Sequence, residues 1–151
     1  MNTLLNFWFP DNNYQKWWFK SNENLDKYIY DNYYKLMLDS YNNMNNINNT
    51  EEIISNIILL DQFSRNINRI VPIDINSYTI KALILSQLWI DNNYHLSQPI
   101  KYTVFALMPF RHMHTIKYNM YVLELLDKME SFSEDPIYIK FKNTTLKKSL
   151  D

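Results

Sequence analysis

Three side chains in this sequence are of types that can exchange protons and hold anions: Asp61, Arg65 and His112. Asp61 and Arg65 stand four residues apart, so on a helix their side chains reach each other. Arg69 follows after four more residues and extends the row of charge. An arginine can hold an anion, and a histidine beside a carboxylate can exchange a proton. Asp61, Arg65 and His112 are therefore the candidate catalytic residues.

Three side chains of the same stretch are candidate ligand-binding residues: Gln62, Asn66 and Arg69. The charges of Asp61 and Arg65 also have structural explanations. A buried pair would tie helices together, whereas an exposed pair would contribute only about 0.3–0.5 kcal/mol. The sequence leaves the site, the buried network and the exposed pair open as alternatives.

The histidines at positions 112 and 114 differ in the direction that helical spacing gives them. His112 shares a stripe with Ile116 and Leu123, which predicts an inward ring near the polar end of the helix that carries Asp61. His114 points the opposite way, and we expect it to be exposed and to titrate near its ordinary pKa of about 6.5. Because histidines two residues apart do not converge on one helix face, we expect no metal site.

Glycine and cysteine are both missing from the sequence. Without glycine the chain has no Gly-rich phosphate-binding loop. Without cysteine it has no disulfide, no thiolate nucleophile and no Cys-ligated metal. We therefore expect no cofactor. The many Asn, Ile, Tyr and Lys residues indicate a coding sequence biased toward A and T, so runs of Asn carry little functional information.

Length and charge limit the organisation and the partners of the chain. Its 151 residues predict a single all-helical domain, in which about 133–151 forms a weakly anchored C-terminal helix or tail. The formal net charge of -1 gives no strong signal for nucleic acid or anionic lipid. No apolar run approaches the about 20 residues that span a bilayer. We expect a soluble intracellular protein in the cytoplasm, with no membrane partner.

The stretch Thr50–Asn68 must position the candidate residues, and apolar side chains surround it nearly completely. A helix that is apolar on all sides is a buried one, so we expect Ile57 and Leu60 to be inaccessible. Thr50 is the expected N-cap. The helix should end before Pro72, because the residue before a proline avoids the α region.

We expect five further helical segments around this central helix, three of them from apolar spacing, and no strand alternation is present. They are Asn22 to about Asn42, Asp74 or Ser77 to Asp91, Ile100–Met108, His112–Ser131, and a last one beginning near Pro136. Their expected apolar residues include Leu25, Ile29, Tyr33 and Leu36; Ile80, Leu83, Ile84 and Leu88; and Ile116, Met120, Leu123 and Leu126. The N-terminal aromatic residues should dock on the core. The fold class is all-α, an antiparallel helical bundle or hairpin array.

Three blocks of the sequence resemble the signature blocks of the bacterial family known as domain of unknown function 924. They are Leu-Leu-Asn-Phe-Trp-Phe at 4–9, Ile-Ile-Leu-Leu-Asp-Gln-Phe-Ser-Arg-Asn-Ile-Asn-Arg at 57–69, and Met-Pro-Phe-Arg-His at 108–112. The resemblance runs from Leu4 to about Asn119. It implies an all-helical, tetratricopeptide-like fold, and the family has no assigned activity.

The central block matches the family core Leu-Asp-Gln-Phe-x-Arg-Asn at residues 60–66, and two departures lie outside it. In the later block, Leu-Pro-x-x-His-Ser-Glu, Pro109 and His112 match, whereas Met108, Met113 and His114 replace Leu, Ser and Glu. An acid-base mechanism would lack that carboxylate. The family's closing Arg- and His-rich segment has no counterpart after position 131. If the family is enzymatic, these departures imply a member that lost the activity or kept only the scaffold.

Three functions remain as expectations. The first is a non-catalytic scaffold that presents a concave helical surface to a protein or peptide partner, by analogy with tetratricopeptide-like folds. The alternative is a small-ligand-binding protein or enzyme with a site around Asp61, Arg65 and His112. The third is an RNA binder that uses exposed aromatic and basic residues. The oligomeric state is left open.

Overall fold

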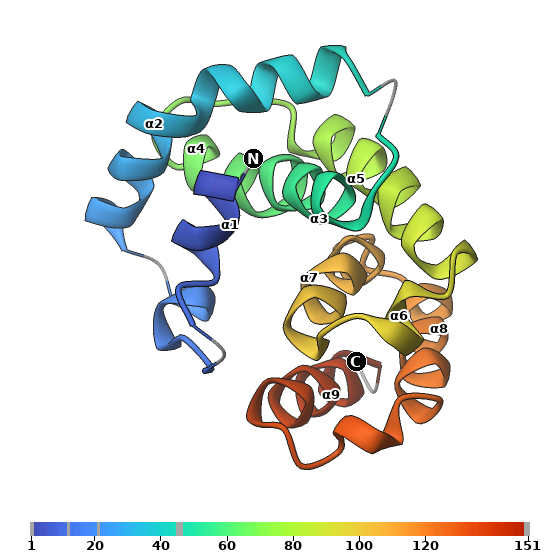
Figure 1. Ribbon diagram of the computed structural model, residues 1–151. Coiled ribbons are helices and arrows are strands. Elements are labelled where there is room, and N and C mark those ends of the chain that lie inside the picture. The colour runs from blue at the N-terminus through green and yellow to red at the C-terminus, as the bar shows by residue number, and fades with distance from the viewer. Residues whose placement is uncertain (1, 12, 21, 45–46, 150–151) are drawn as a thin grey trace.

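The computed structural model describes residues 2–11, 13–20, 22–44 and 47–149, and this part of the chain contains helices and no strand (Figure 1). The predicted all-α fold is therefore confirmed, while its likeness to tetratricopeptide folds stays a prediction. The elements are α1 Asn2–Trp8, the 3-10 helix η1 Lys16–Phe19, α2 Glu23–Asn42, α3 Thr50–Ile57, the π-helix η2 Ile58–Phe63, α4 Ser64–Asn68, α5 Ile75–Asp91, α6 Tyr94–Ser97, α7 Ile100–Arg111, α8 Ile116–Asp127, the 3-10 helix η3 Glu130–Phe132 and α9 Pro136–Ser149.

The elements α3, η2 and α4 follow one another without a break and form the central helix, residues 50–68. Ile57 and Leu60 are completely buried, which confirms the prediction of a buried central helix. Its N-cap is Asn49 rather than Thr50. The side-chain oxygen of Asn49 accepts a hydrogen bond from the backbone N–H of Glu52 at 2.9 Å, so Thr50 already lies inside the helix.

Three helices enclose the central helix. The helix α2 packs against η2 and α4, α5 packs against α3 and η2, and α7 packs against α3 and η2 (Figure 1). The N-terminal aromatic residues dock on this core as predicted: Trp8 and Trp18 are buried, and Trp18 Nε1 donates to the carbonyl oxygen of Trp8 at 2.8 Å. Large aromatic rings thus close the end of the core where the chain begins.

The buried face of α2 includes Ile29 and Tyr33 of the predicted stripe, which confirms these two, but it is only partly the predicted one. Its fully packed row includes Asp26, Ile29, Tyr33 and Met37, whereas Leu25 and Leu36 are only half-buried. Successive members of this row are three or four residues apart, as one helix face requires. This face places a carboxylate, Asp26, in the interface between α2 and the central helix.

The helix α5 also turns a different face inward than its apolar residues suggested. Ala82, Leu85 and Trp89 are buried, while Ile80 and Ile84 are exposed. The sequence is apolar on both sides here, so periodicity alone could not select the packed face. Tertiary packing against α3 and α7 selects the face with the small Ala82.

The predicted helices over Ile100–Met108 and His112–Ser131 are divided differently in the structure. The helix α7 continues through Pro109 to Arg111, and α8 begins only at Ile116. Pro109 has no backbone N–H to donate to the carbonyl oxygen of Phe105, yet the two residues after it remain helical. The predicted stripe of α8 is wrong, because Ile116 is exposed. His112 therefore belongs to the end of α7.

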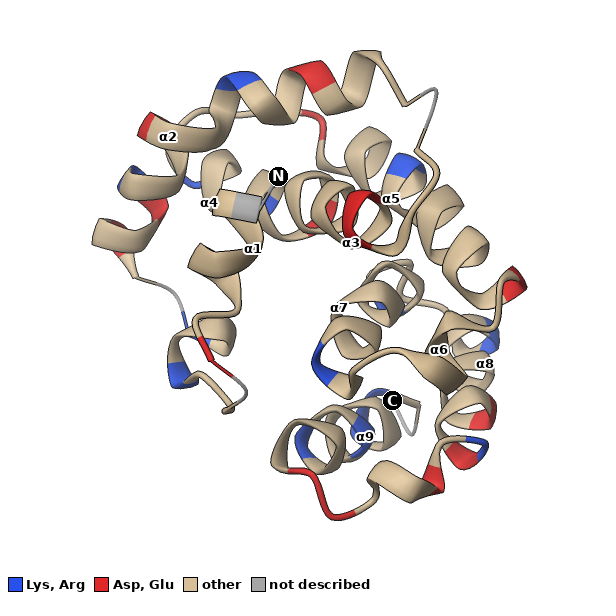
Figure 2. Cartoon of the chain, in the orientation of Figure 1, with Lys and Arg blue, Asp and Glu red and all other residues tan. Residues whose placement is uncertain are grey.

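The C-terminal helix α9 packs against α7 and α8. Phe141 is buried, and the Tyr138 hydroxyl donates to the carbonyl oxygen of Leu126 at 2.8 Å. Figure 2 shows basic residues along α9 and acidic residues on the turn before it. Within the described ranges, no helix is both long and apolar enough to cross a bilayer.

Candidate functional site

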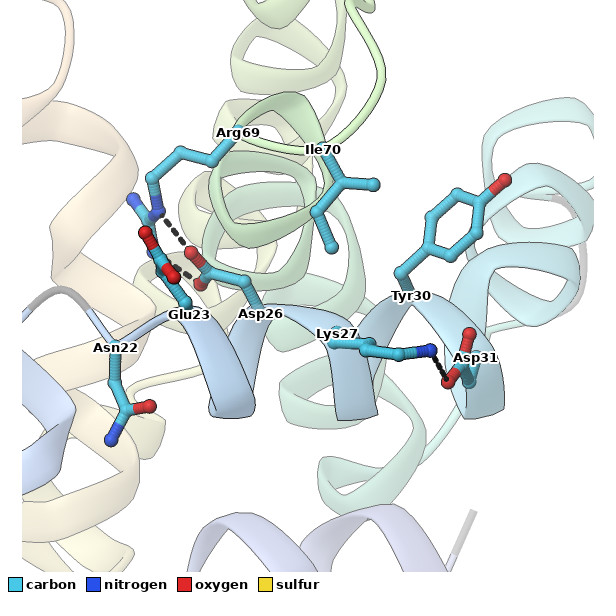
Figure 3. Close-up of a pocket in the computed structure, with 8 residues that line it drawn as sticks. All are labelled: Asn22, Glu23, Asp26, Lys27, Tyr30, Asp31, Arg69 and Ile70. Atoms are coloured by element: carbon cyan, nitrogen blue, oxygen red, sulfur yellow. Dashed lines mark hydrogen bonds and ion pairs between the residues drawn. The ribbon is translucent and has the colours of Figure 1, made fainter.

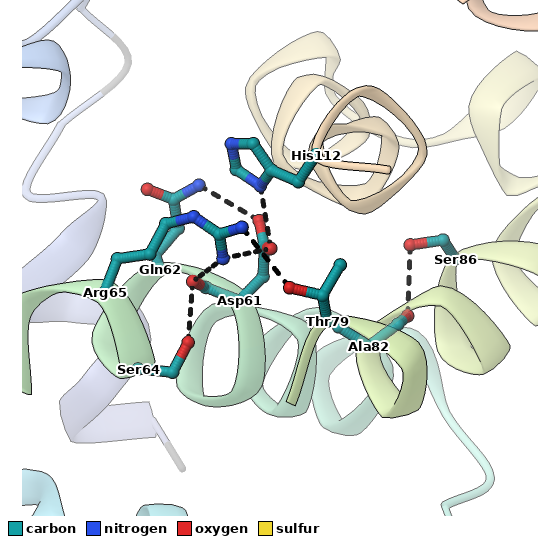
Figure 4. A network of polar contacts seen from close by, with 8 residues as sticks. All are labelled: Asp61, Gln62, Ser64, Arg65, Thr79, Ala82, Ser86 and His112. Carbon is teal, nitrogen blue, oxygen red and sulfur yellow. Dashed lines mark hydrogen bonds and ion pairs between the residues drawn. The ribbon is translucent and has the colours of Figure 1, made fainter. Parts of the chain in front are cut away.

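Asp61 lies in the π-helical segment η2 and is the centre of a polar network (Figure 4). Its side chain is fully buried. The Oδ1 atom accepts a hydrogen bond from Arg65 Nη1 at 2.9 Å and lies 2.8 Å from His112 Nδ1. The Oδ2 atom accepts a hydrogen bond from Gln62 Nε2 at 3.2 Å. The structure thus brings the three candidate catalytic residues together at one carboxylate.

The π-helical segment itself explains part of this arrangement. A π-helical turn interrupts the regular i to i+4 hydrogen bonding of an α-helix, and such turns occur frequently at functional sites. Here the backbone carbonyl of Asp61 accepts hydrogen bonds from Ser64 Oγ at 3.0 Å and from Arg65 Nη1 at 2.9 Å. Arg65 Nη2 also donates to Thr79 Oγ1 of α5 at 3.3 Å. Arg65 therefore holds both the Asp61 side chain and its backbone.

The charge state of Asp61 follows from two opposing effects. Burial by itself raises the pKa of this carboxyl, while the nearby positive charges of His112 and Arg65 and the hydrogen bonds from His112 and Gln62 lower it. The favourable contacts prevail, so the pKa of Asp61 lies below its ordinary value. Asp61 is thus an ionised carboxylate in the core.

His112 reaches Asp61 from the last turn of α7, where its backbone N–H donates to the carbonyl oxygen of Met108 at 2.9 Å. The inward direction that was predicted is confirmed, although His112 is not part of α8. Because Asp61 is ionised, the Nδ1 atom of the imidazole carries the proton that it shares with Oδ1. The Nε2 atom lies on the opposite side of the ring from Asp61 (Figure 4). The side chain keeps 17% of its surface exposed.

Arg69 and Asn66 do not join Asp61 but bind a second carboxylate, Asp26 of α2. Figure 3 shows the contact between Arg69 and Asp26. Arg69 donates from Nε to Oδ2 at 2.7 Å and from Nη2 to Oδ1 at 2.8 Å. Asn66 Nδ2 donates to Oδ1 at 2.8 Å. Asp26 was not predicted as a site residue, although a charged residue in line with Ile29 and Tyr33 was a detectable signal.

This second cluster is also a charged one at neutral pH. Burial raises the pKa of Asp26, whereas the hydrogen bonds from Arg69 and Asn66 and the charge of Arg69 lower it. Together the lowering effects exceed the effect of burial, so the pKa of Asp26 lies below its ordinary value. The hydrogen bond to Asp26 raises the pKa of Arg69. Arg65 and Arg69, about one helical turn apart, thus form two ion pairs, each with its own carboxylate.

A pocket of about 200 Å³ lies between these clusters and the N-terminal aromatic residues. No carboxylate is among the described residues that line it. They are Trp8, Trp17, Trp18, Phe19, Lys20, Leu25, Gln62, Arg65, Asn66, Arg69, Met108, Arg111 and His112. Every candidate site residue except the buried Asp61 therefore borders this pocket.

Arg111 is a buried, charged lining residue that was not predicted. It is 7% exposed, and burial lowers the pKa of its guanidinium to about 10, against the opposing attraction of Asp61. The guanidinium carbon lies 4.8 Å from the centre of the Phe141 ring. Among the described residues, the buried Nε and Nη1 atoms of Arg111 have no hydrogen-bond partner. The signal in the sequence was its place directly before His112.

A wider groove of about 910 Å³ lies on α2 and includes Tyr30 and Ile70 (Figure 3). Two ion pairs occupy its charged residues: Arg69 pairs with Asp26, and Lys27 pairs with Asp31 at 3.0 Å. Glu23 is the described charged residue of the groove outside these pairs. The smaller pocket, in contrast, has Lys20 and Arg111 besides the paired Arg65 and Arg69, and no described carboxylate lines it.

His114 lies apart from the network and is exposed, as predicted. Its backbone φ of 55° is in the left-handed region, at the turn between α7 and α8. Its pKa, however, is lower than expected, because partial burial and the positive charges of Lys148, His112 and Arg65 disfavour the protonated ring. In the described ranges, no group of three His, Asp or Glu residues is placed to hold a metal ion.

Comparison with known proteins gives one match. No curated protein and no solved structure matches the sequence. The family described as bacterial protein of unknown function (DUF924) matches residues 4–148, which extends well beyond the region of resemblance that ended near Asn119. Because this match spans most of the chain, the protein belongs to the DUF924 family.

Proposed function

We propose that the protein binds a small ligand in the pocket beside Asp61 and uses His112 to exchange a proton with it, as a binding protein or an enzyme. The observation that carries the proposal is the 2.8 Å contact between His112 Nδ1 and the buried Asp61 Oδ1. A buried carboxylate in this position fixes the tautomer and the orientation of an imidazole. Nε2 is then the atom that accepts or donates a proton at a ligand.

The other polar residues have distinct roles in this proposal. Asp61 is a positioning residue, since it acts on a ligand through His112. Arg65 holds Asp61 and also borders the pocket, so its charge acts on both. Gln62, Asn66 and Arg69 border the same pocket and are the proposed ligand-binding residues.

A thermal-shift screen against small carboxylic acids and phosphate monoesters tests this proposal. We expect a subset of them to raise the melting temperature of the wild-type protein by several degrees. The His112→Asn variant keeps a polar group near Asp61 but cannot exchange the proton, so its ligand-induced shift should fall and lose its pH dependence. His114→Asn is the matched control, because it removes an exposed histidine outside the pocket.

The outcomes of the screen separate clearly. A shift that depends on His112 and not on His114 supports the proposal. The proposal fails if no compound stabilises the wild type, or if His112→Asn and His114→Asn respond alike.

The expectation of a non-catalytic scaffold for a protein or peptide stays a prediction. The feature that favours it is the exposed pair Ile80 and Ile84, one helical turn apart on α5. Binding to such a partner should weaken at least tenfold in Ile80→Lys and Ile84→Lys, measured by calorimetry once a partner is isolated. RNA binding also stays a prediction, although Trp8 and Trp18 are buried and so cannot stack on bases.

A further inference from the structure

Three buried hydrogen-bond donors without a partner among the described residues belong to side chains that line the pocket. They are Nε1 of Trp8 and the Nε and Nη1 atoms of Arg111. Trp8 is 2% exposed and Arg111 is 7% exposed. Buried polar groups are almost always hydrogen-bonded, so unsatisfied donors that share a pocket indicate a missing acceptor.

The other tryptophans show that this is a particular property of Trp8. Trp18 Nε1 donates to the carbonyl oxygen of Trp8 at 2.8 Å. Trp17 Nε1 donates to Gln15 Oε1 at 3.2 Å, and Trp89 Nε1 donates to Thr103 Oγ1 at 3.1 Å. Trp8 is therefore the tryptophan whose indole N–H has no partner among the described residues.

The charge of the pocket specifies what kind of acceptor is missing. Its lining includes Lys20, Arg65, Arg69 and Arg111, and no carboxylate is among the described lining residues. Arg65 and Arg69 are neutralised by Asp61 and Asp26, respectively. Arg111 has no such ion pair in the described part of the chain, and its guanidinium lies over the Phe141 ring. A neutral acceptor would leave this buried charge uncompensated.

We infer that the pocket binds a compact oxyanion, a carboxylate or phosphate group, through the indole N–H of Trp8 and the guanidinium of Arg111. The charged guanidinium donates stronger hydrogen bonds to such a group than to a neutral acceptor. The pocket volume of about 200 Å³ suits a small ligand. The inference rests on the proposed function in that it names the class of ligand that His112 faces.

The test follows the four indole N–H signals of the ¹⁵N-labelled full-length protein during titration with sodium phosphate and, separately, with sodium acetate. Sodium chloride at matched ionic strength is the reference. We expect the Trp8 signal to shift in a saturable manner with at least one oxyanion, while the Trp89 signal, whose donor is already bonded, stays in place. The oxyanion with the lower dissociation constant identifies the group as a phosphate or a carboxylate.

Variants of Arg111 test whether the shift of the Trp8 signal depends on the guanidinium. Arg111→Gln should raise the dissociation constant at least tenfold, and Arg111→Lys should raise it less, because lysine keeps the charge but lacks the planar guanidinium donors. Lys16→Gln is the matched control, because it removes one positive charge from an exposed residue of η1 that does not border the pocket. It should leave the dissociation constant within twofold of the wild type.

Three results would overturn the inference: a Trp8 signal that ignores both oxyanions, a shift that chloride reproduces, or an unchanged dissociation constant in Arg111→Gln and Arg111→Lys. The wild-type titration decides even if Arg111→Gln fails to fold.

The His112→Asn variant separates this inference from the proposed function. If it binds the oxyanion like the wild type and shows the same pH dependence, the oxyanion site stands and the proton exchange fails. If ligands stabilise the protein through His112 while the Trp8 signal is unaffected, the reverse holds.

Discussion

Asp61 carries a full charge in the core, and the contacts that make this possible come from two separate elements. Arg65 and Gln62 approach from the central helix, and His112 approaches from α7. Removing one partner of a buried ion pair leaves the other uncompensated, which typically costs about 3–5 kcal/mol. The network therefore links the conformation of the site to the stability of the fold.

We predict that Asp61→Ala lowers the free energy of unfolding by more than about 1 kcal/mol and by as much as 3–5 kcal/mol, measured by urea denaturation. The control is Asp31→Ala, which breaks an exposed pair with Lys27 at the same i, i+4 spacing. That pair should contribute only about 0.3–0.5 kcal/mol. Equal losses in the two variants would mean that the Asp61 network is solvated.

The free energy of unfolding at acid pH should depend on the protonation of Asp61. The pKa of Asp61 is lowered on folding, so its contribution to stability is complete above the ordinary value of 3.8 and is lost as the pH falls further. We predict that the difference in stability between the wild type and Asp61→Asn shrinks as the pH is lowered from 5 to about 2. Urea melts across this range measure it, and a difference that stays constant would contradict the assignment.

Arg111 should affect stability in the opposite direction. Burial lowers the pKa of its guanidinium to about 10, which means that the folded state disfavours the charge at neutral pH. We predict that Arg111→Met, in buffer without phosphate or carboxylate, raises the free energy of unfolding by about 1–3 kcal/mol. Thermal and urea melts give the value. A clear loss of stability would show that the guanidinium is satisfied within the protein.

At the level of elements, Asp26 joins α2 to the end of the central helix through three hydrogen bonds from Arg69 and Asn66. We predict that Asp26→Ala lowers the free energy of unfolding by about 3–5 kcal/mol. A double-mutant cycle with Arg69→Ala should show a coupling of at least about 1 kcal/mol, since the two side chains share a bidentate contact. Additive losses would indicate that the two residues act independently.

The sequence could predict an element only where its pattern allowed a single interpretation. The central helix is apolar on all sides, so its burial followed from periodicity alone. The helix α5 is apolar on two sides, and contacts with α3 and α7 decide that Ile84 is exposed. The boundary at Pro109 was misplaced, because the steric cost of proline predicts a break there, whereas α7 continues to Arg111.

The same distinction applies to the site. The pairing of Asp61 with Arg65 is local along one helix, and spacing predicts it. The contact between Asp61 and His112 joins residues far apart in the chain; it was correctly suspected, but from a stripe that does not exist. Asp26 and Arg111 were missed because their significance comes from partners on other elements. Periodicity carries no information on such long-range contacts.

At the scale of the whole molecule, the elements differ in how completely they are surrounded. The central helix packs against α2, α5 and α7, whereas α9 packs against α7 and α8 and has one exposed side with several lysines (Figures 1 and 2). Local opening costs less where fewer buried contacts must be broken. The polar network lies in the part of the fold that should open least.

Hydrogen exchange followed by mass spectrometry can test this order. We predict that amides of residues 53–67 exchange slowest, at the rate of global unfolding, and that amides of residues 136–149 exchange faster through local opening of α9. This corresponds to the proposed weak anchoring of about 133–151. Phe141→Leu should accelerate exchange in α9 before it affects the central helix. Phe141 is a large buried ring of α9, and the Arg111 guanidinium of α7 packs over it. Equal protection of α9 and the central helix in the wild type would instead mean that the chain unfolds as one cooperative unit to its last helix.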